Sequence, residues 1–139
     1  MQINSIFQRM RGFGILAAAL VGFGAGEGAL AQDAEHGERV FNKCKACHQV
    51  GEGAASRTGP QLNGIVGAQA GAVEDFRYSK AFIDSGIIWD ANNLSSFLAN
   101  PREFLPGTRM SFAGLRKEEE IDNVIAYLET FAADGSVAE

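Results

Sequence analysis

Several residue types that mark common classes of protein are scarce in this chain. Its 139 residues include only two cysteines and two histidines. Cys44 and Cys47 are three residues apart, so a disulfide between them would constrain almost no chain and stabilise little. A structural zinc site needs four ligands, which would take both cysteines and both histidines. Neither a disulfide framework nor a zinc site is a good explanation of the two cysteines.

Positively charged residues are also few. Twelve lysines and arginines stand against 17 aspartates and glutamates, which gives a net charge of −5. This balance argues against nucleic-acid binding, because binding to phosphates needs a basic face. The hydrophobic content of 46% is ordinary for a globular domain, and the length suits one domain with a modest core.

Only one long hydrophobic run occurs, and it lies near the N-terminus. Arg9 and Arg11 precede an apolar, Gly/Ala-rich run over residues 12–26, and Ala29-Leu30-Ala31 resembles a small-x-small cleavage site. These are the three parts of a secretory signal peptide, predicted over residues 1–31. The alternative, an uncleaved anchor, is disfavoured because the run is shorter than the roughly 20 residues of a spanning helix. We expect a mature domain over residues 32–139, with a net charge of −6 after the loss of two arginines and one glutamate.

Helical patterns dominate the predicted domain, with no convincing strand pattern and no internal repeat. The clearest is an apolar stripe with the i, i+3, i+4, i+7 spacing of one helix face, formed by Ile121, Val124, Ile125 and Leu128. Asp90 is a good N-cap and Pro101 a stop signal for another helix. The sequence predicts an all-α fold with helices over residues 33–44, 79–85, 90–100 and 117–131.

Two stretches lack any helical pattern and read as irregular. Residues 49–78 contain six glycines and Pro60, and residues 101–115 contain a Pro106-Gly107 turn signal. A loop as long as the first is uncommon in a compact domain unless it is functional. A large apolar ligand could hold it in place, so the domain looks built around a cofactor.

The motif Cys44-Lys45-Ala46-Cys47-His48 is Cys-x-x-Cys-His, the attachment sequence for c-type haem. Two thiols at this spacing add to the two vinyl groups of one haem edge, and the next residue, His48, ligates the iron through Nε2. A thioredoxin-like Cys-x-x-Cys would need a preceding strand and a βαβ context, and neither is visible. The sequence therefore predicts one covalently bound haem c.

The sixth iron position has two candidate ligands. Met110 is the only methionine left after removal of the signal peptide, and it lies in a Pro/Gly-rich stretch rather than on a helical stripe. His36 precedes Cys44 on the same predicted helix, where the chain already serves the His48 side. Met110 is therefore favoured over His36. A thioether is a soft ligand that favours ferrous iron and raises the reduction potential.

With these motifs the chain resembles the class I cytochromes c, in particular the mitochondrial type and the bacterial cytochromes c2. The resemblance extends from Gly37 to about Leu128, and the Cys-x-x-Cys-His motif together with the stretch Pro106–Gly114 around Met110 makes it specific. It implies a small cytochrome c fold, in which the N- and C-terminal helices cross and long loops wrap one haem. It also implies a close crossing of the last helix at Gly37, against Val124, Tyr127 and Leu128.

The resemblance assigns further haem contacts. Thr58-Gly59-Pro60 matches a family loop whose proline carbonyl accepts the Nδ1–H of the histidine ligand. Tyr78 and Trp89 match hydrogen-bond donors to a haem propionate, and Thr108 belongs to the methionine loop. The implied cofactor-binding residues are Cys44, Cys47, His48, Met110, Pro60, Tyr78, Trp89 and Thr108, and the implied iron ligands are His48 and Met110.

Three positions depart from the family pattern. Ala68 stands where the family often has an arginine near the propionates. Phe97 replaces a tyrosine that often hydrogen-bonds near the methionine sulfur, and Phe82 replaces an asparagine that often helps to hold a buried water. The loss of the tyrosine hydroxyl and the asparagine amide would make the haem pocket drier on the side of the methionine ligand.

The expected function is single-electron transport in the periplasm by a monomer, not enzymatic catalysis. By resemblance, a bc1-type complex or a dehydrogenase donates electrons and a terminal oxidase, reaction centre or reductase accepts them. The expected docking surface for acidic faces of these redox partners is the basic set of Lys43, Lys45, Arg57, Arg102, Arg109, Arg116 and Lys117. A peroxidase or gas sensor, the competing class, would need an iron without Met110. Neither nucleic-acid binding nor stable membrane insertion after cleavage is expected.

The predicted signal peptide has a direct test. Mass spectrometry of the native protein should show a chain that starts at Gln32 and carries the mass of one haem. Detection of an N-terminus upstream of Gly26 would instead indicate a retained membrane anchor.

Overall fold

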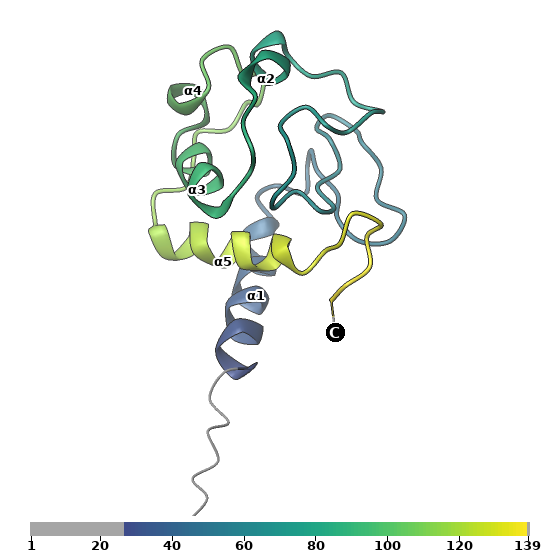
Figure 1. The fold of residues 1–139 in the computed structure, drawn as a ribbon. Helices are drawn as coiled ribbons and strands as arrows, with labels where there is room; N and C mark the ends of the chain where they lie inside the picture. The colour runs from purple at the N-terminus through teal and green to yellow at the C-terminus, as the bar shows by residue number, and fades with distance from the viewer. Residues whose placement is uncertain (1–26, 139) are drawn as a thin grey trace, which may run out of the picture.

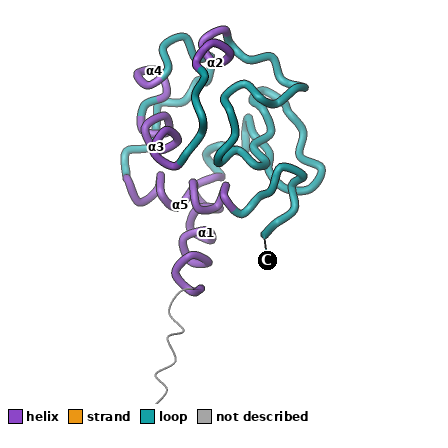
Figure 2. Tube along the Cα trace, viewed as in Figure 1, coloured by secondary structure: helices purple, strands orange, loops and turns teal. Residues whose placement is uncertain are grey.

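The computed structural model describes residues 27–138 and is helical, with long loops (Figures 1 and 2). Two isolated antiparallel pairings, Gln69 with Ile88 and Phe131 with Val137, are the nearest approach to a strand within these residues. The predicted all-α fold is therefore confirmed. The helices are α1 (Glu27–Phe41), α2 (Lys80–Ser85), α3 (Ala91–Ala99), α4 (Pro101–Phe104) and α5 (Glu118–Glu129).

Most of the predicted signal peptide, residues 1–26, lies outside the described residues. In the full chain α1 begins at Glu27, so the predicted cleavage point after Ala31 lies within this helix. Among the described residues, no helix combines the length and the apolar character needed to cross a membrane.

Helices α1 and α5 cross closely, and Gly37 is the residue that permits it. A Cβ atom at this position would lie 1.9 Å from the carbonyl oxygen of Asn123 and 2.6 Å from Cβ of Tyr127. Tyr127 was among the expected contacts, whereas the nearest atom belongs to Asn123, which the sequence did not single out. Val124 and Leu128, the other expected contacts, are buried in the core of the domain.

The stretch after α1 turns sharply into the Cys-x-x-Cys-His motif. The predicted end of the helix at Cys44 was three residues too late, because α1 ends at Phe41. The amides of Cys44 and Lys45 donate to the Phe41 carbonyl, and those of Cys47 and His48 donate to the Cys44 carbonyl. These successive turns hold the motif against the end of α1.

Side-chain caps set the starts of α3 and α4. Asp90 accepts a hydrogen bond from the Asn93 amide and begins α3, as predicted. Pro101 was expected only to stop this helix, and residues 101–115 were expected to be irregular. That expectation was wrong for residues 101–104, since Pro101 is the first residue of α4 and the Asn100 side chain caps it. Proline suits this position, because the first amide of a helix has no intrahelical acceptor.

Helix α5 supplies one side of the core. The stripe of Ile121, Val124, Ile125 and Leu128 is buried as predicted. The helix ends at Glu129 rather than Phe131, and the following residues fold back as a tail beside the first long loop (Figure 1). The core of the domain therefore lies between α1, α3 and α5, with the long loops to one side.

The α1–α5 crossing predicts a strong effect of Gly37→Ala. The added methyl group would meet the backbone of α5 and force the helices apart, with an expected loss of about 1–3 kcal/mol in the free energy of unfolding. Denaturant unfolding of the holoprotein measures this loss. Glu38→Ala, on the exposed neighbouring position, should change it by no more than about 0.5 kcal/mol. A Gly37→Ala protein more stable than wild type, as alanine's helix propensity alone would produce, would contradict the close crossing.

Candidate haem site

A cavity of about 530 Å³ lies between the core helices and the two long loops. Its volume is within the range of sites that bury a cofactor-sized ligand. The end of α1 and the Cys-x-x-Cys-His motif form one part of its wall, and the other parts come from residues 58–65, 68–82 and 109–112, from Trp89 and from α3 and α5. Segments that are far apart in the sequence therefore meet around one space.

Both cysteines line this cavity, and neither is in a disulfide. Burial raises the pKa of Cys44, an effect that the nearby Lys43 charge partly offsets and Cys47 adds to. A raised pKa does not suit a thiolate nucleophile or a redox-active thiol, which needs the opposite shift. Two half-buried thiols on the wall of an apolar cavity suit attachment of a ligand.

His48 is held in one tautomer. Its Nδ1 lies 2.7 Å from the carbonyl oxygen of Pro60. A carbonyl can only accept, so Nδ1 carries the proton and Nε2 keeps its lone pair. Burial lowers the pKa of His48, against the opposing effect of the Pro60 hydrogen bond, and the ring is therefore neutral. A neutral imidazole that donates from one nitrogen is the usual state of a metal-ligating histidine.

Gly59 makes room for this ring. A Cβ atom at Gly59 would lie 2.4 Å from Cε1 and 2.8 Å from Nδ1 of His48. The amide of Gly59 donates to the Cys47 carbonyl at 2.9 Å. The Thr58-Gly59-Pro60 loop therefore lies directly on the histidine, which only a residue without a side chain allows.

Met110 lines the same cavity as His48. It follows a turn at Pro106-Gly107, and its amide donates to the Thr108 hydroxyl at 3.2 Å. Thr108, which was expected to contact the cofactor, is not part of the cavity wall. The guanidinium of Arg109 donates to the Arg77 carbonyl and so joins the Met110 segment to the loop before α2.

The alternative sixth ligand, His36, is placed elsewhere. It lies on α1 next to Gly37, at the crossing with α5, and it is not among the residues that line the cavity. Of the two candidates that the sequence offered, only Met110 is brought to the same space as His48.

One wall of the cavity is a cluster of aromatic rings. Phe82 packs edge-on against Phe97, with ring centroids 5.8 Å apart, and both pack against Trp89. Tyr78 joins the cluster through Phe82, and burial raises its pKa. The two phenylalanines that replace polar family residues thus pack edge-on against each other, and Ala68 also lines the cavity.

Two members of the aromatic cluster were missed by the sequence analysis. Phe76 packs edge-on against Tyr78, with ring centroids 4.9 Å apart, and Phe104 packs against both Trp89 and Phe97. The only signal was the count of ten phenylalanines, which shows that rings are abundant but not which of them meet.

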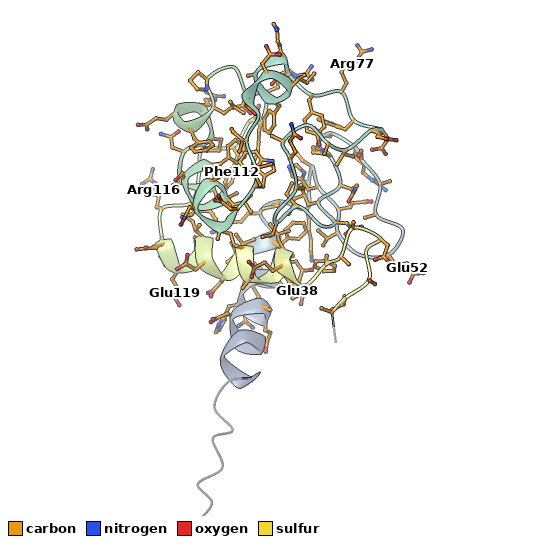
Figure 3. All side chains as sticks on the ribbon, in the orientation of Figure 1. Glu38, Glu52, Arg77, Phe112, Arg116 and Glu119 are labelled. Carbon is orange, nitrogen blue, oxygen red and sulfur yellow. The ribbon has the colours of Figure 1, made fainter. Side chains whose placement is uncertain are left out.

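The charged residues on the cavity wall are Lys43, Arg77 and Arg109, all of them cationic. Lys43 also forms an ion pair at 2.9 Å with Glu120, in the first turn of α5. Arg77 was not singled out by the sequence, and its side chain is directed away from the domain (Figure 3).

The expected docking residues are all exposed, but only Lys43 and Arg109 lie on the cavity wall. Lys45 borders a separate surface hollow beside Glu52 and Tyr127. The remaining four, all outside the cavity wall, are Arg57, Arg102, Arg116 and Lys117. Figure 3 shows Arg116 at the left edge of the domain and Phe112, which lines the cavity, near the middle of this face.

The residues present fit a covalently bound haem. The same apolar cavity offers two free thiols, a neutral imidazole with an available Nε2 and a thioether sulfur. A soft sulfur ligand and an imidazole are a donor pair of haem iron in electron-transfer proteins.

Comparisons with known proteins agree with this donor set. The family model for cytochrome c matches residues 34–132. The chain is 50% identical over 102 residues to cytochrome c2 from Afifella marina, which covers 71% of this chain and 82% of that protein. It is 48% identical over 120 residues to cytochrome c-554 from Methylosinus trichosporium, with 85% and 91% covered.

A solved structure shows the same fold. Cytochrome cH from Methylobacterium extorquens aligns with a TM-score of 0.66 and 41% sequence identity, over 70% of this chain and 98% of that one. The family match extends over most of the chain and includes the Cys-x-x-Cys-His motif. This chain therefore belongs to the cytochrome c family, as an electron carrier that is not an enzyme and that binds one haem c covalently.

Proposed function

We propose that residues 32–139 form a periplasmic single-electron carrier, in which Cys44 and Cys47 attach the haem and His48 and Met110 ligate its iron. The observation that carries this proposal is the meeting of these four side chains around one cavity. When bound, the haem supplies the one-electron change between ferric and ferrous iron. The chain supplies attachment, ligands and a water-poor surrounding.

The protein residues have separate tasks around the iron. Gly59 and Pro60 hold the His48 ring in one orientation and keep Nε2 deprotonated. The thioether of Met110 favours the reduced iron. His48 and Met110 would together fill both open positions of the iron and so would leave no site on it for a substrate.

Further contacts belong to the same proposal. Tyr78 and Trp89, both on the cavity wall, would donate hydrogen bonds to the haem carboxylates. Thr108 acts on the cofactor only through Met110, since its hydroxyl accepts a hydrogen bond from the backbone amide of Met110. The aromatic cluster of Phe82, Trp89 and Phe97 limits the entry of water on its side of the cavity.

Export to the periplasm is supported by the leader pattern of residues 1–31 and by the chemistry of attachment. Thioether bonds make the cofactor permanent, which suits a protein that leaves the compartment in which free haem is available. The proposed donors are a bc1-type complex or a dehydrogenase. The proposed acceptors are a terminal oxidase, a reaction centre or a reductase, met through the basic docking residues.

Replacement of Met110 tests the proposed iron ligands. Met110→Ala should abolish the weak long-wavelength absorption band that a thioether ligand gives ferric haem, and it should lower the midpoint potential. The open iron should then bind added azide or imidazole, which titration by absorption spectroscopy detects. His36→Ala is the control and should leave band, potential and ligand binding unchanged. Loss of the band in His36→Ala but not in Met110→Ala would assign the sixth ligand to His36.

Charge reversal tests the docking surface. Arg102→Glu and Arg116→Glu should slow oxidation of the reduced protein by hexacyanoferrate(III), by up to about tenfold at low salt, because steering acts on association. The effect should shrink as salt rises, since exposed charges are screened over about 10 Å at 0.1 M. The midpoint potential should change little. Lys43→Glu is a less clean probe, because it would place two carboxylates side by side with Glu120.

The control for docking is Arg39→Glu, which changes the net charge equally but also places a carboxylate beside Glu35. Arg39 is exposed on α1, is paired with Glu35 and lies outside the docking set. It should slow the anionic oxidant much less than Arg102→Glu or Arg116→Glu. A cationic oxidant, tris(phenanthroline)cobalt(III), should show the reverse order of rates. Equal effects of all three reversals would mean that only net charge matters and that no basic docking surface exists.

A further inference from the structure

The C-terminal tail, residues 130–138, is folded rather than extended. The Ala132 amide donates to the Ser136 carbonyl at 2.9 Å, the Gly135 amide donates back to the Ala132 carbonyl, and the Ala138 amide reaches the Thr130 carbonyl. The Asp134 carboxylate accepts from both the amide and the hydroxyl of Ser136, and the hydroxyl contact chiefly lowers its pKa. The tail is therefore a closed turn with its own hydrogen bonds.

This tail lies tightly against the first long loop. A Cβ atom at Gly135 would be 2.3 Å from the carbonyl oxygen of Gly51 and 2.8 Å from Nδ2 of Asn63. A Cβ atom at Gly64 would be 2.9 Å from Cα of Ala133. Both glycines have positive φ, +85° and +63°. Two glycines, one on each side, thus allow the two backbones to touch.

The loop that the tail contacts is the one that carries Pro60. Residues 59–64, the segment around Pro60, donate three backbone hydrogen bonds to carbonyls elsewhere in the chain, two of them from Gly59 to Cys47 and from Leu62 to Gln49. These two tie it to the residues on either side of His48. The third runs from the Gly64 amide to the Phe131 carbonyl at 3.0 Å.

This third hydrogen bond is the only one of the three that reaches a distant part of the sequence, and side chains reinforce the contact. The Asn63 amide group accepts from the Gly51 amide at 2.7 Å and donates to the Gly51 carbonyl at 2.9 Å. Gly135 of the tail rests on this pair. The Phe131 ring packs edge-on against Tyr127, with centroids 5.1 Å apart, and so anchors the base of the tail to α5.

We propose that the C-terminal tail acts as a clasp that positions the Pro60 carbonyl on Nδ1 of His48 and thereby lowers the reduction potential of the iron. Gly64, Asn63 and Gly135 are positioning residues in this view, since they act through Pro60 and not on the cofactor. The hydrogen bond from Nδ1 raises the basicity of the imidazole, which favours ferric iron. The inference rests on the proposed ligation by His48.

The test compares two glycine substitutions in the holoprotein. Gly135→Ala adds a methyl group that meets the Gly51 carbonyl. Gly53→Ala is the matched control, because Gly53 also has a positive φ, +72°, but has open space around its Cβ position. Both substitutions carry the same type of backbone strain, so both should lower the unfolding temperature. Only Gly135→Ala should make the midpoint potential more positive, as measured by spectroelectrochemistry.

A gentler variant guards against a tail substitution that prevents folding. Ser136→Ala removes the hydroxyl contact to Asp134 without a change of charge and without a clash. It should move the potential in the same direction as Gly135→Ala, by a smaller amount. Amide hydrogen exchange should also quicken at Gly59 and Leu62, which flank Pro60, and not only at Gly64.

Two outcomes would overturn the clasp. An unchanged potential in Gly135→Ala and Ser136→Ala would show that the tail contributes to stability alone. A more negative potential would show that the loosened loop admits water instead of weakening the histidine hydrogen bond. Failure of the proposed ligation is seen separately: in that case His48→Ala would keep the absorption spectrum of the wild-type protein.

Discussion

The close crossing of α1 and α5 at Gly37 is the contact on which the arrangement of the cavity depends. Because the backbones touch there, the end of α1 is held over the buried stripe of α5. The turns that follow Phe41 then deliver Cys44, Cys47 and His48 to the space beside Val124 and Leu128. A side chain at Gly37 would tilt α1 and move all three functional residues together.

The rest of the domain is organised by loops rather than by a continuous core. Backbone hydrogen bonds, the Asn63 side chain and glycines with positive φ hold the segment around Pro60. Aromatic rings from α2, α3 and α4 form another wall of the cavity. Between them lies an apolar cavity of about 530 Å³. A covalent cofactor of matching character completes the core, which explains how a small domain with few helices is stable.

The charge on the cavity wall is opposite in sign to the net charge of the chain. The protein is acidic in total, yet the charged residues on the cavity wall are Lys43, Arg77 and Arg109. One of them, Lys43, is already neutralised in part by Glu120. The net charge therefore says little about the local charge around the cavity.

The sequence by itself determined the chemistry. A contiguous motif such as Cys44–His48 can be recognised from spacing, the one methionine within residues 27–138 can be identified by counting, and caps such as Asp90 act within one turn of their helix. Helix ends were predicted less accurately, because Pro101 both stops α3 and is the first residue of α4. Tertiary structure alone decided which distant residues meet: the Asn123 carbonyl at Gly37, Phe104 in the aromatic cluster, Arg77 on the cavity wall and the tail at Gly51. The physical reason is that such contacts depend on where the loops return, and no local pattern encodes that position.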